Sequence, residues 1–476
     1  MGGSIKGTFM IKKTRSMFSV IYLSVLLAIF SFVSVSFGEE KLGDKVYETT
    51  LANGLKVILL ENHKAPVVTV QVWYRVGSRN EAWGKTGLSH LLEHMMFKGS
   101  KRFTAEQFVR IIEENGGKNN AFTSHDYTAY FINISADRVA IPLEFEADRM
   151  RNALFDEKEF STEKKVVLEE RRLRTEDNPQ SYLHEQVLAT AYQVHPYHWP
   201  IIGWMEDLER LTLADAREYY NRYYTTVNAF LIVAGDFSRQ ELLPKVEQAF
   251  GHLPATDAPH QGVGREPPQK GERRVIIKRE GLVPALMIGY HVPNLKNPDS
   301  YVLDVIDAIL SSGKSSRFYE HLIREKQVAL RADVDHSLTS LDPSLFFISA
   351  EVLAGKDLLT LEKAIDDEIM RLQTEPVTPE ELSKAKNQME ARFLYGQDSV
   401  FYQAMVLAQH EIAATWRRID DYLPAIRRVT ADDVMRVARQ YLIPENRTVG
   451  LFSPITLQDN NPVPAKNLVK EKGHTR

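Results

Sequence analysis

The alternation of apolar and polar residues predicts strands and helices that interleave along the chain. Four segments rich in β-branched and aromatic residues are predicted strands: LKVILL from Leu55, VVTVQVWYRV from Val67, TAYFINIS from Thr128 and AFLIVAGDF from Ala229. Residue patterns with helical spacing predict helices over 105–115, 136–153 and 160–175. Because these elements lack the regular β-α-β order of a parallel sheet, we predict an α+β fold with antiparallel sheets flanked by helices.

One unit occurs twice in the body of the chain. The segment TLADAREYYNRYYTTVN from Thr212 aligns without a gap with TADDVMRVARQYLIPEN from Thr430. Upstream, Gly99 aligns with Gly313 at nearly the same spacing. So long a period indicates two homologous domains, since solenoid repeats are far shorter. We therefore predict domains at 41–255 and 272–460, joined by a Pro- and Gly-rich linker at 256–271.

The first residues of the chain predict export. Several Lys and Arg residues precede an uncharged, largely apolar stretch over 17–38, and Ser36-Phe37-Gly38 stands just before Glu39. This order is typical of a secretory signal with a small-x-small cleavage site. The alternative is an uncleaved membrane anchor, because the stretch is long enough to cross a bilayer as a helix. In either case we expect residues 1–38 to direct the body of the protein out of the cytoplasm.

Composition and charge exclude several classes of function. A chain of 476 residues exceeds what one hydrophobic core usually supports. With 59 Lys and Arg against 63 Asp and Glu, it lacks the basic surplus that binding to nucleic acid requires. Cysteine is absent, which excludes a thiol nucleophile and any Cys-ligated metal. A bound metal must therefore be held by His and carboxylate groups.

A short motif in the first copy predicts a metal site. His90 and His94 are four positions apart within a predicted amphipathic helix, so both imidazoles lie on one face. Glu93 stands beside the second His, where a carboxylate can take a proton from water at a metal. This is the inverted zincin pattern, His-x-x-Glu-His. The alternative is a chance meeting of three polar residues on a solvated face.

The second copy lacks this motif. Asp304, Asp307 and Ala308 occupy the aligned positions, and they cannot form the same pair of imidazole ligands. The first half of the chain therefore contains the predicted metal site, and the second half contributes to the fold without such a site.

A catalytic zinc site needs a third protein ligand as well as an open position. The predicted helix over 160–175 offers three carboxylates. Glu163 and Glu170 are two helical turns apart and share one face, whereas Glu169 points about 100° away, toward solvent. Without the histidine pair, Glu163 and Glu170 would be read as surface charges paired with Lys or Arg.

Taken together, these residues resemble a known family. The segments HLLEHMMFKGS, NGGKNNAFTSHDYTAYF, EADRM, EKKVVLEERRLR and HPYHWPIIGWMEDL are similar to those of the M16 (pitrilysin-like) metallopeptidases. The likeness is to the two-domain bacterial kind related to mitochondrial processing peptidase, and it covers about 45 to 455. It implies zinc as cofactor, with His90, His94 and Glu170 as ligands. Glu93 would be the catalytic base, and Glu163 would complete the catalytic set as a carboxylate supporting the site.

The resemblance also implies substrate-binding residues. Asn120, Ala121 and Phe122 match an edge strand to which a bound peptide adds as a further strand; the alternative is an internal strand. The family usually contributes an Arg and a Tyr, seven positions apart, from its second half. Here Arg324 fits the first position, but Arg331 stands at the second. An Arg cannot replace a phenol as a neutral donor, although it can stabilise negative charge.

The predicted function is that of a zinc-dependent endopeptidase acting on peptides or unfolded polypeptide segments. The alternative is a non-catalytic or partner-dependent subunit, because a second chain could supply the missing Arg and Tyr. The resemblance implies either a homodimer or a heterodimer with an M16-like subunit, the domains enclosing a peptide chamber. We expect a location in the bacterial periplasm, with membrane contact only through an uncleaved N-terminal segment, and no nucleic-acid partner.

Overall fold

The computed structural model describes residues 1–3, 41–260 and 262–455. Apart from residues 1–3, the predicted export signal lies outside these ranges, and so does the predicted end of the second domain at 460. Among the described residues, no helix has the length and apolar character needed to span a bilayer.

The first repeat is built on a mixed sheet with the strand order β1-β2-β6-β3-β5-β4. The strands are β1 (Val46–Thr50), β2 (Lys56–Glu61), β3 (Val67–Tyr74), β4 (Lys118–Thr123), β5 (Thr128–Ser135) and β6 (Ala229–Gly235). The four strands predicted from composition correspond to β2, β3, β5 and β6. Strands β3 and β6 lie in the middle and are almost entirely buried, because their apolar side chains are covered on both faces.

The helices of the first repeat pack with its own sheet, with the exception of α6. They are α2 (Leu88–Met95), α3 (Ala105–Glu114), α4 (Ala140–Asn152), α5 (Glu157–Arg171), α6 (Pro179–Ala191), α7 (Met205–Arg210), α8 (Leu213–Tyr223) and α9 (Arg239–Phe250). The predicted helix over 160–175 is α5, which continues as a π-helical turn, Arg172–Glu176. Residues of α2, α4, α8 and the sheet share one hydrophobic core.

The second repeat reproduces this order, but its described sheet has no counterpart of β1. Its sheet, β7-β11-β8-β10-β9, consists of β7 (Arg273–Glu280), β8 (Ala285–Val292), β9 (Ala329–Asp335), β10 (Ser344–Val352) and β11 (Arg447–Ile455). Its helices are α10 (Asp299–Ser311), α11 (Leu358–Thr374), α12 (Pro379–Gly396), α13 (Val400–Ala413), α14 (Tyr422–Arg428) and α15 (Ala431–Tyr441). A second hydrophobic core lies between this sheet and these helices.

Matching caps show the repeat at the level of single hydrogen bonds. Helix α8 begins with the Thr212 hydroxyl accepting from the Asp215 amide at 3.2 Å, while the Asp215 carboxylate accepts from the Thr212 amide at 2.9 Å. Thr430 and Asp433 form the same pair at the start of α15, at 3.1 and 3.0 Å. Such a capping box satisfies amide groups that the first helical turn leaves without partners. The alignment of Thr212 with Thr430 is thus a true structural equivalence.

The predicted α+β fold of two homologous domains is confirmed, but the sheets are not wholly antiparallel. In the first repeat β2 pairs with β6 in parallel, and in the second β7 pairs with β11 in parallel. The remaining pairings are antiparallel. The last strand of each repeat returns after several helices and inserts between two early strands, and such a long connection allows parallel pairing.

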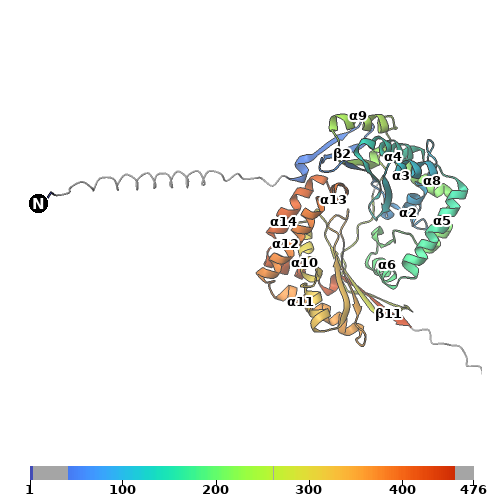
Figure 1. Ribbon diagram of the computed structural model, residues 1–476. Coiled ribbons are helices and arrows are strands. Elements are labelled where there is room, and N and C mark those ends of the chain that lie inside the picture. Colours follow the sequence, from blue (N-terminus) through green and yellow to red (C-terminus); the bar gives the residue numbers. More distant parts are fainter. Residues whose placement is uncertain (4–40, 261, 456–476) are drawn as a thin grey trace, which may run out of the picture. The chain divides into compact units, whose positions relative to one another are not determined.

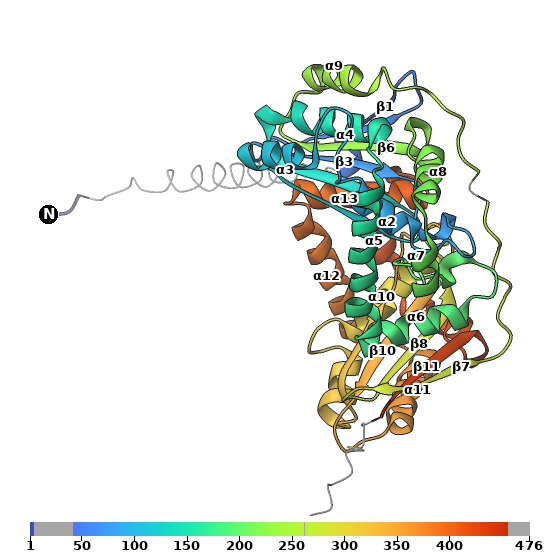
Figure 2. The same ribbon diagram turned by 90° about the vertical axis from the view of Figure 1, so that its right-hand side faces the viewer.

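The two repeats exchange one helix each. Helix α6 of the first repeat packs against β7, β8 and β11 of the second, where Leu183 and Val187 join a cluster with Phe452. Helix α13 of the second repeat packs against β3 and β6 of the first. Figure 2 shows both helices beside the sheets of the opposite repeats. The exchange makes each sheet depend on the other half of the chain for its cover.

Ion pairs hold α13 in this position. Glu411, buried on α13, accepts from Lys56 at 2.9 Å and from Arg75 at 2.7 Å, both on the first repeat. A nearly buried carboxylate with two charged partners is costly to leave unpaired, so the network favours one docking position for the helix.

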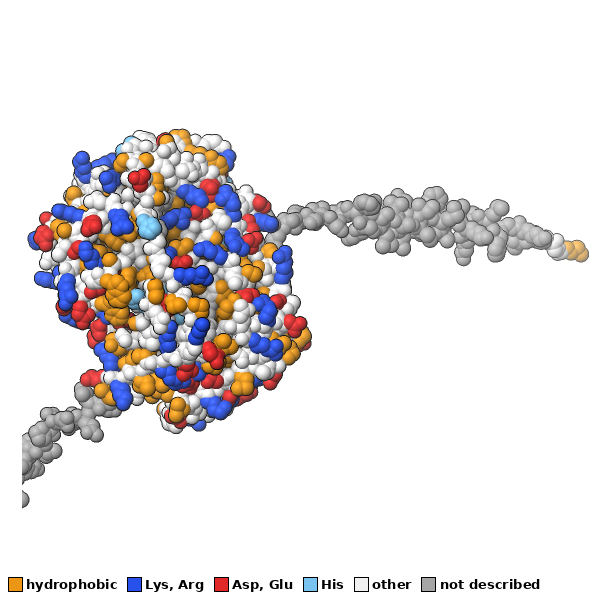
Figure 3. All heavy atoms as spheres, turned by 180° about the vertical axis from the view of Figure 1, so that it is seen from behind, with side chains coloured by type: hydrophobic (Ala, Val, Ile, Leu, Met, Phe, Trp, Pro, Cys, Tyr) orange, Lys and Arg blue, Asp and Glu red, His pale blue; other side chains and the backbone are white. Residues whose placement is uncertain are grey.

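Charges of both signs are interspersed on the surface. On the face seen in Figure 3, Lys and Arg side chains alternate with Asp and Glu side chains, with hydrophobic side chains between them. The face shown has no extended basic patch of the kind that phosphate backbones require.

Candidate metal and peptidase site

Helix α2 positions the predicted motif. Leu88, Leu91, Leu92 and Met95 are buried in the core, which turns the opposite side of the helix toward an open cavity. His90, Glu93 and His94 lie on that side and are partly buried. The apolar face of α2 therefore fixes the direction in which the motif points.

A buried carboxylate holds the start of α2. Glu81 accepts from the backbone amides of Gly87 and Ser89, both at 2.7 Å. Burial raises the pKa of Glu81 to about 8, although these two hydrogen bonds act in the opposite direction. Gly87 has a φ of 87°, a conformation that favours glycine, and a Cβ there would lie 2.6 Å from the carbonyl oxygen of Ile202. This turn aims the helix at the site.

Helix α5 brings two carboxylates opposite the motif. The Asp156 side chain caps its start by accepting from the amides of Lys158 and Glu159 at 2.9 and 3.1 Å. Glu163 is buried and Glu170 is partly buried, whereas Glu169 is exposed. The expected division of the three carboxylates between the two faces is therefore observed.

Three potential ligand atoms converge from α2 and α5. Glu170 Oε2 lies 3.8 Å from His90 Nε2 and 3.5 Å from His94 Nε2. Within the described parts of the chain, these three residues form the one group with ligand atoms all within 4.8 Å of one another. Tetrahedral ligands about 2.1 Å from a zinc ion are separated by about 3.4 Å, so the arrangement fits that metal closely.

The ionisation states also suit a metal. Burial, with smaller contributions from His94 and Arg174, lowers the pKa of His90 to about 3. His90 is consequently a neutral imidazole at neutral pH, the form that ligates metals. Arg174 pairs with Glu170 Oε1 at 2.7 Å, and this leaves Oε2 facing the two imidazoles.

Glu163 contacts a histidine and a lysine. Its Oε2 atom lies 3.2 Å from His94 Nδ1, and its Oε1 atom lies 2.6 Å from Lys98 Nζ. A carboxylate at Nδ1 favours the tautomer with the proton on Nδ1, so that Nε2 keeps its lone pair for a metal. Glu163 thus positions His94, and the structure does not place it among the three converging ligand atoms.

We expect Glu163→Gln to weaken zinc binding about 10- to 100-fold, because His94 loses the charge that fixes its tautomer and orientation. Zinc affinity measured by competition with a chromophoric chelator tests this expectation. Glu169→Gln is the matched control, since Glu169 lies on the same helix but is exposed and pairs with Arg172. Equal zinc affinity in Glu163→Gln and the parent protein would show that Glu163 does not contribute to zinc binding.

Glu93 is held by a hydroxyl from β4. Thr123 Oγ1 donates to Glu93 Oε2 at 2.5 Å. Burial raises the pKa of the Glu93 carboxyl, an effect that the Thr123 hydrogen bond opposes. The second carboxylate oxygen stays available beside the histidine pair. A carboxylate in this position can exchange a proton with a water or amine in the cavity.

The motif opens into a cavity of about 610 Å³. Its walls include β4, where Ala121, Phe122 and Thr123 line it, and α6. Met287 on β8 adds a contact from the second repeat. β4 is the edge strand of its sheet and pairs only with β5, so the alternative of an internal strand is wrong. An open strand edge therefore runs along the cavity.

The structure brings some predicted substrate residues to this cavity and not others. Ala121 and Phe122 line it, while Asn120 is exposed on the same edge strand. Arg324, on the π-helical segment Phe318–Glu325, is 68% exposed and pairs with Glu320 at 2.8 Å. Arg331, on β9, is 72% exposed and pairs with Asp333 at 2.5 Å. Neither Arg lines the cavity, so their role in substrate binding stays a prediction.

Sequence reasoning missed three residues of the site. Arg174 and Lys98 pair with Glu170 and Glu163, and Thr123 holds Glu93. The pairing of Arg174 with Glu170 could have been predicted from the sequence, because Arg174 follows Glu170 by one turn of a predicted helix. Thr123 and Lys98 depend on how β4 and α2 pack, which no local spacing reveals.

Two family models match the chain. Residues 56–203 match the model described as Insulinase (Peptidase family M16), and residues 210–389 match Peptidase M16 inactive domain. The first range contains the whole histidine and glutamate site. The second contains Asp304, Asp307 and Ala308, which stand where the motif would be.

Similar proteins carry names of the same kind. The zinc protease PqqE of Helicobacter pylori is 34% identical over 413 residues, which are 85% of this chain and 92% of that protein. A probable mitochondrial-processing peptidase subunit beta of Arabidopsis thaliana is 28% identical over 86% of this chain and 78% of its own. The crystal structure of a protease from Helicobacter pylori superposes with a TM-score of 0.83 at 33% identity, covering 86% of this chain and 99% of that one.

Fold and relatives together define a class of protein, the two-repeat members of the M16 peptidases. This chain belongs to the M16 peptidase family.

Proposed function

We propose that this protein is a zinc-dependent endopeptidase that hydrolyses peptides or unfolded polypeptide segments. The observation that carries the proposal is the convergence of His90, His94 and Glu170 beside Glu93 in an open cavity. The names of the similar zinc proteases support the metal and the reaction class.

His90 and His94, each through Nε2, and Glu170, through Oε2, would hold the zinc ion. When bound, zinc supplies Lewis acidity that acidifies water and polarises a carbonyl group. Glu163 keeps the His94 Nδ1 proton in place, and Arg174 fixes the second oxygen of Glu170. The protein contributes this arrangement before any substrate arrives.

Glu93 would carry the proton in the reaction. Its carboxylate accepts a proton from the attacking water and later donates it to the amine of the departing peptide fragment. The Thr123 hydroxyl holds one carboxylate oxygen at 2.5 Å, and the Glu93 side chain lines the cavity. The raised pKa of Glu93 suits this double role, because a group that must both take and give a proton works best with a pKa close to the working pH.

A substrate would bind as an added strand. The outer edge of β4 has no partner strand among the described residues, and Ala121, Phe122 and Thr123 border the cavity. The Ala121 amide donates to Asn120 Oδ1 at 2.9 Å, a bond that an added strand would replace. Backbone pairing gives affinity with little demand on side chains, which supports a broad range of extended peptides. A folded domain cannot present such a strand without local unfolding.

A partner subunit is the second candidate, and one observation favours it. Arg324 and Arg331 are exposed and lie outside the cavity, and the second position lacks a Tyr. We propose that the active form is a dimer of this chain or a heterodimer with an M16-like subunit that brings the missing donor. We also propose an exported location, in the periplasm or anchored so as to face it, on the evidence of residues 1–38 alone.

Hydrolysis of a mixed fluorogenic peptide library by the purified protein tests the function. We expect cleavage that a chelator abolishes and added zinc restores. Cleavage that persists in excess chelator would contradict the proposed zinc dependence. No cleavage, with one zinc still bound per chain, would favour the partner-dependent form, and adding a candidate subunit should then restore activity.

A further inference from the structure

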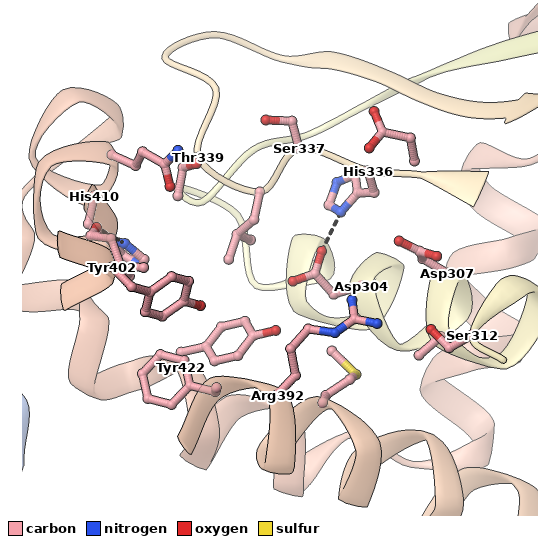
Figure 4. A pocket seen from close by; sticks show the side chains of 17 residues that line it. Asp304, Asp307, Ser312, His336, Ser337, Thr339, Arg392, Tyr402, His410 and Tyr422 are labelled. Carbon is pink, nitrogen blue, oxygen red and sulfur yellow. Dashed lines mark hydrogen bonds and ion pairs between the residues drawn. The ribbon is translucent and has the colours of Figure 1, made fainter. Parts of the chain in front are cut away.

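The second repeat contains a cavity of its own, with a volume of about 510 Å³. Figure 4 shows its polar side chains pointing inward from the surrounding helices and from the loop after β9. Asp304 and Asp307 come from α10, and His336 follows β9. No part of the proposed peptidase mechanism uses this cavity.

The cavity is the counterpart of the metal cavity. In the alignment that pairs Gly99 with Gly313, Asp304 corresponds to His90 and Asp307 to Glu93, and all four line their respective cavities. The second repeat has therefore lost the metal ligands but kept the hollow, with carboxylates at these two positions.

A basic residue replaces the third predicted metal ligand in the second cavity. Helices α5 and α12 begin at Glu157 and Pro379, and Lys164 and Lys386 donate to equivalent backbone carbonyl groups before α8 and α15. At this spacing Arg392 corresponds to Glu170, and each lines the cavity of its own repeat. The correspondence supports a common origin of the two hollows.

The replacement of imidazoles changes what the cavity can bind. Asp304, Asp307 and Asp335 line it with carboxylates, and Arg392 is the sole Lys or Arg among its lining residues. These groups do not form a ready metal site, because the one set of ligand atoms within 4.8 Å in the described chain is that of the first repeat. The surplus of carboxylates favours a positively charged ligand without metal-like coordination demands.

The two aspartates on α10 differ in their partners. Asp304 Oδ1 lies 2.6 Å from His336 Nδ1. Asp307 Oδ1 accepts from Ser311 Oγ at 3.0 Å, and Ser311 is its one hydrogen-bond partner within the described chain. Burial raises the pKa of Asp307 to about 7, and the neighbouring Asp304 adds to the rise. The Asp307 carboxyl group therefore has an oxygen available to a ligand and forms no ion pair with a Lys or Arg of the described chain.

Two buried histidines each have one ring nitrogen without a partner. The His336 side chain is fully buried, and its Nε2 atom has no hydrogen-bond partner. His410 Nδ1 lies 2.8 Å from the carbonyl oxygen of Val406, and its buried Nε2 atom is likewise unpartnered. Because a carbonyl oxygen only accepts, His410 Nδ1 is the donor, and Nε2 of the neutral ring is an acceptor. In a neutral His336 ring that donates Nδ1–H to Asp304, Nε2 is an acceptor as well.

Aromatic rings form the rest of the lining. Phe393, Tyr402 and Tyr422 line the cavity, and the rings of Phe393 and Tyr422 have centroids 5.4 Å apart. Ring faces attract organic cations and accommodate their alkyl portions. Carboxylates, acceptor nitrogens and ring faces all complement one kind of ligand, a group with several N–H donors and a positive charge.

We propose that this cavity binds an organic ammonium group, with Asp304 and Asp307 as its anionic partners and the rings of Phe393, Tyr402 and Tyr422 around its alkyl part. An ammonium group has three donors and no acceptor, which matches the unsatisfied acceptors of the lining. The ligand is either a small free amine or an amine carried by a peptide. Binding requires neither zinc nor peptidase activity.

Isothermal titration calorimetry on chelator-treated protein at pH 8 tests the proposal. Removing the metal prevents an amine from binding through zinc. We expect n-hexylamine, which is protonated at this pH, to bind at least tenfold more tightly than 1-hexanol. Equal affinity for both probes, or no binding of the amine, would overturn the proposal, because the cavity would then be merely apolar or closed to this chemistry.

A conservative substitution tests whether the amine binds at Asp307. We expect Asp307→Asn to weaken n-hexylamine binding at least tenfold at pH 8. Asp432→Asn, on α15 and outside the cavity, is the matched control and should bind as the parent does. A thermal melt of each variant confirms that it is folded. Unchanged affinity in a folded Asp307→Asn protein would refute the assignment, and Tyr402→Phe and Phe393→Leu provide further variants of the same cavity.

The pH dependence gives an independent readout. An ammonium group favours ionised Asp307, so affinity should rise from pH 6 to pH 8 as this carboxyl loses its proton. The other titratable or charged groups that face the cavity are Asp304, Asp335, His336, Arg392, His410, Tyr402 and Tyr422. Asp307→Asn should flatten the rise. A rise that is just as steep in this variant would show that another of these groups controls binding and would contradict the role of Asp307.

A second pair of probes separates the two sources of the amine. The peptide acetyl-Gly-Lys-Gly-amide carries one ammonium group, and acetyl-Gly-Ala-Gly-amide carries none. Tighter binding of the Lys peptide than of n-hexylamine supports a peptide-borne ligand, whereas the reverse supports a small free amine. If neither amine-bearing probe binds better than its uncharged counterpart, the proposal fails, whatever the peptidase assay shows.

Discussion

Glu93→Gln should retain zinc and lose peptide hydrolysis by about 10³-fold or more. The amide is nearly isosteric with the carboxylate and can still accept a hydrogen bond from Thr123. It cannot take a proton from water, and general-base assistance typically contributes 10²- to 10⁴-fold to a rate. A loss of about 10³-fold corresponds to about 4 kcal/mol of transition-state stabilisation. Because Glu93 is not one of the three converging ligand residues, the metal content should stay at one zinc per chain.

The measurement combines kcat/KM on the best peptide of the library with zinc content by mass spectrometry. Glu169→Gln serves as the control, since it makes the same chemical change at an exposed position of α5. Hydrolysis by Glu93→Gln at the parent rate would exclude Glu93 as the base. Loss of both zinc and activity would instead show that Glu93 helps to hold the metal.

The spacing of the residues was enough to predict which side chains share a helix face. His90 and His94 are one helical turn apart, and Glu163 and Glu170 are two turns apart, so a helix must present each pair on one face. The α-helical period is local and survives any tertiary arrangement. That α2 and α5 face each other does not follow from spacing, and in the sequence only the resemblance to a known family implies it.

Other features depend on contacts between distant parts of the chain. The parallel pairs β2–β6 and β7–β11 join strands that lie far apart in the sequence, and strand composition alone does not distinguish parallel from antiparallel pairing. The exchange of α6 and α13 is equally non-local, because each helix buries its apolar residues against the sheet of the other repeat. Both features follow from packing, which a single local pattern does not encode.

The second cavity illustrates the same limit. The aligned residues Asp304, Asp307 and Ala308 could be seen in the sequence, and they show that the histidine pair is missing. The hollow itself needs α10, α12, α13, α14 and the loop after β9, whose lining residues span 304–422. A repeat that loses its metal ligands need not lose the space around them, since the surrounding helices still have to pack on their sheet.

His94→Ala should abolish zinc binding and, with it, detectable hydrolysis. His94 supplies one of three ligand atoms and is the histidine that Glu163 orients, so its removal leaves His90 and Glu170 with two ligand atoms and a cavity edge open to water. Structural and catalytic zinc sites are held by three or four protein ligands, and a two-ligand site loses the metal readily during purification.

Zinc content by mass spectrometry and peptide hydrolysis are measured on the same preparation, with circular dichroism to confirm folding. His63→Ala is the control, because His63 is exposed, pairs with Asp236 and reports zinc bound nonspecifically by surface imidazole. A zinc content equal to that of the parent would remove His94 from the ligand set. The contrast with Glu93→Gln is the decisive point, since adjacent substitutions on α2 should separate the metal from the proton transfer. His94→Ala should lose both zinc and activity, whereas Glu93→Gln should lose activity alone.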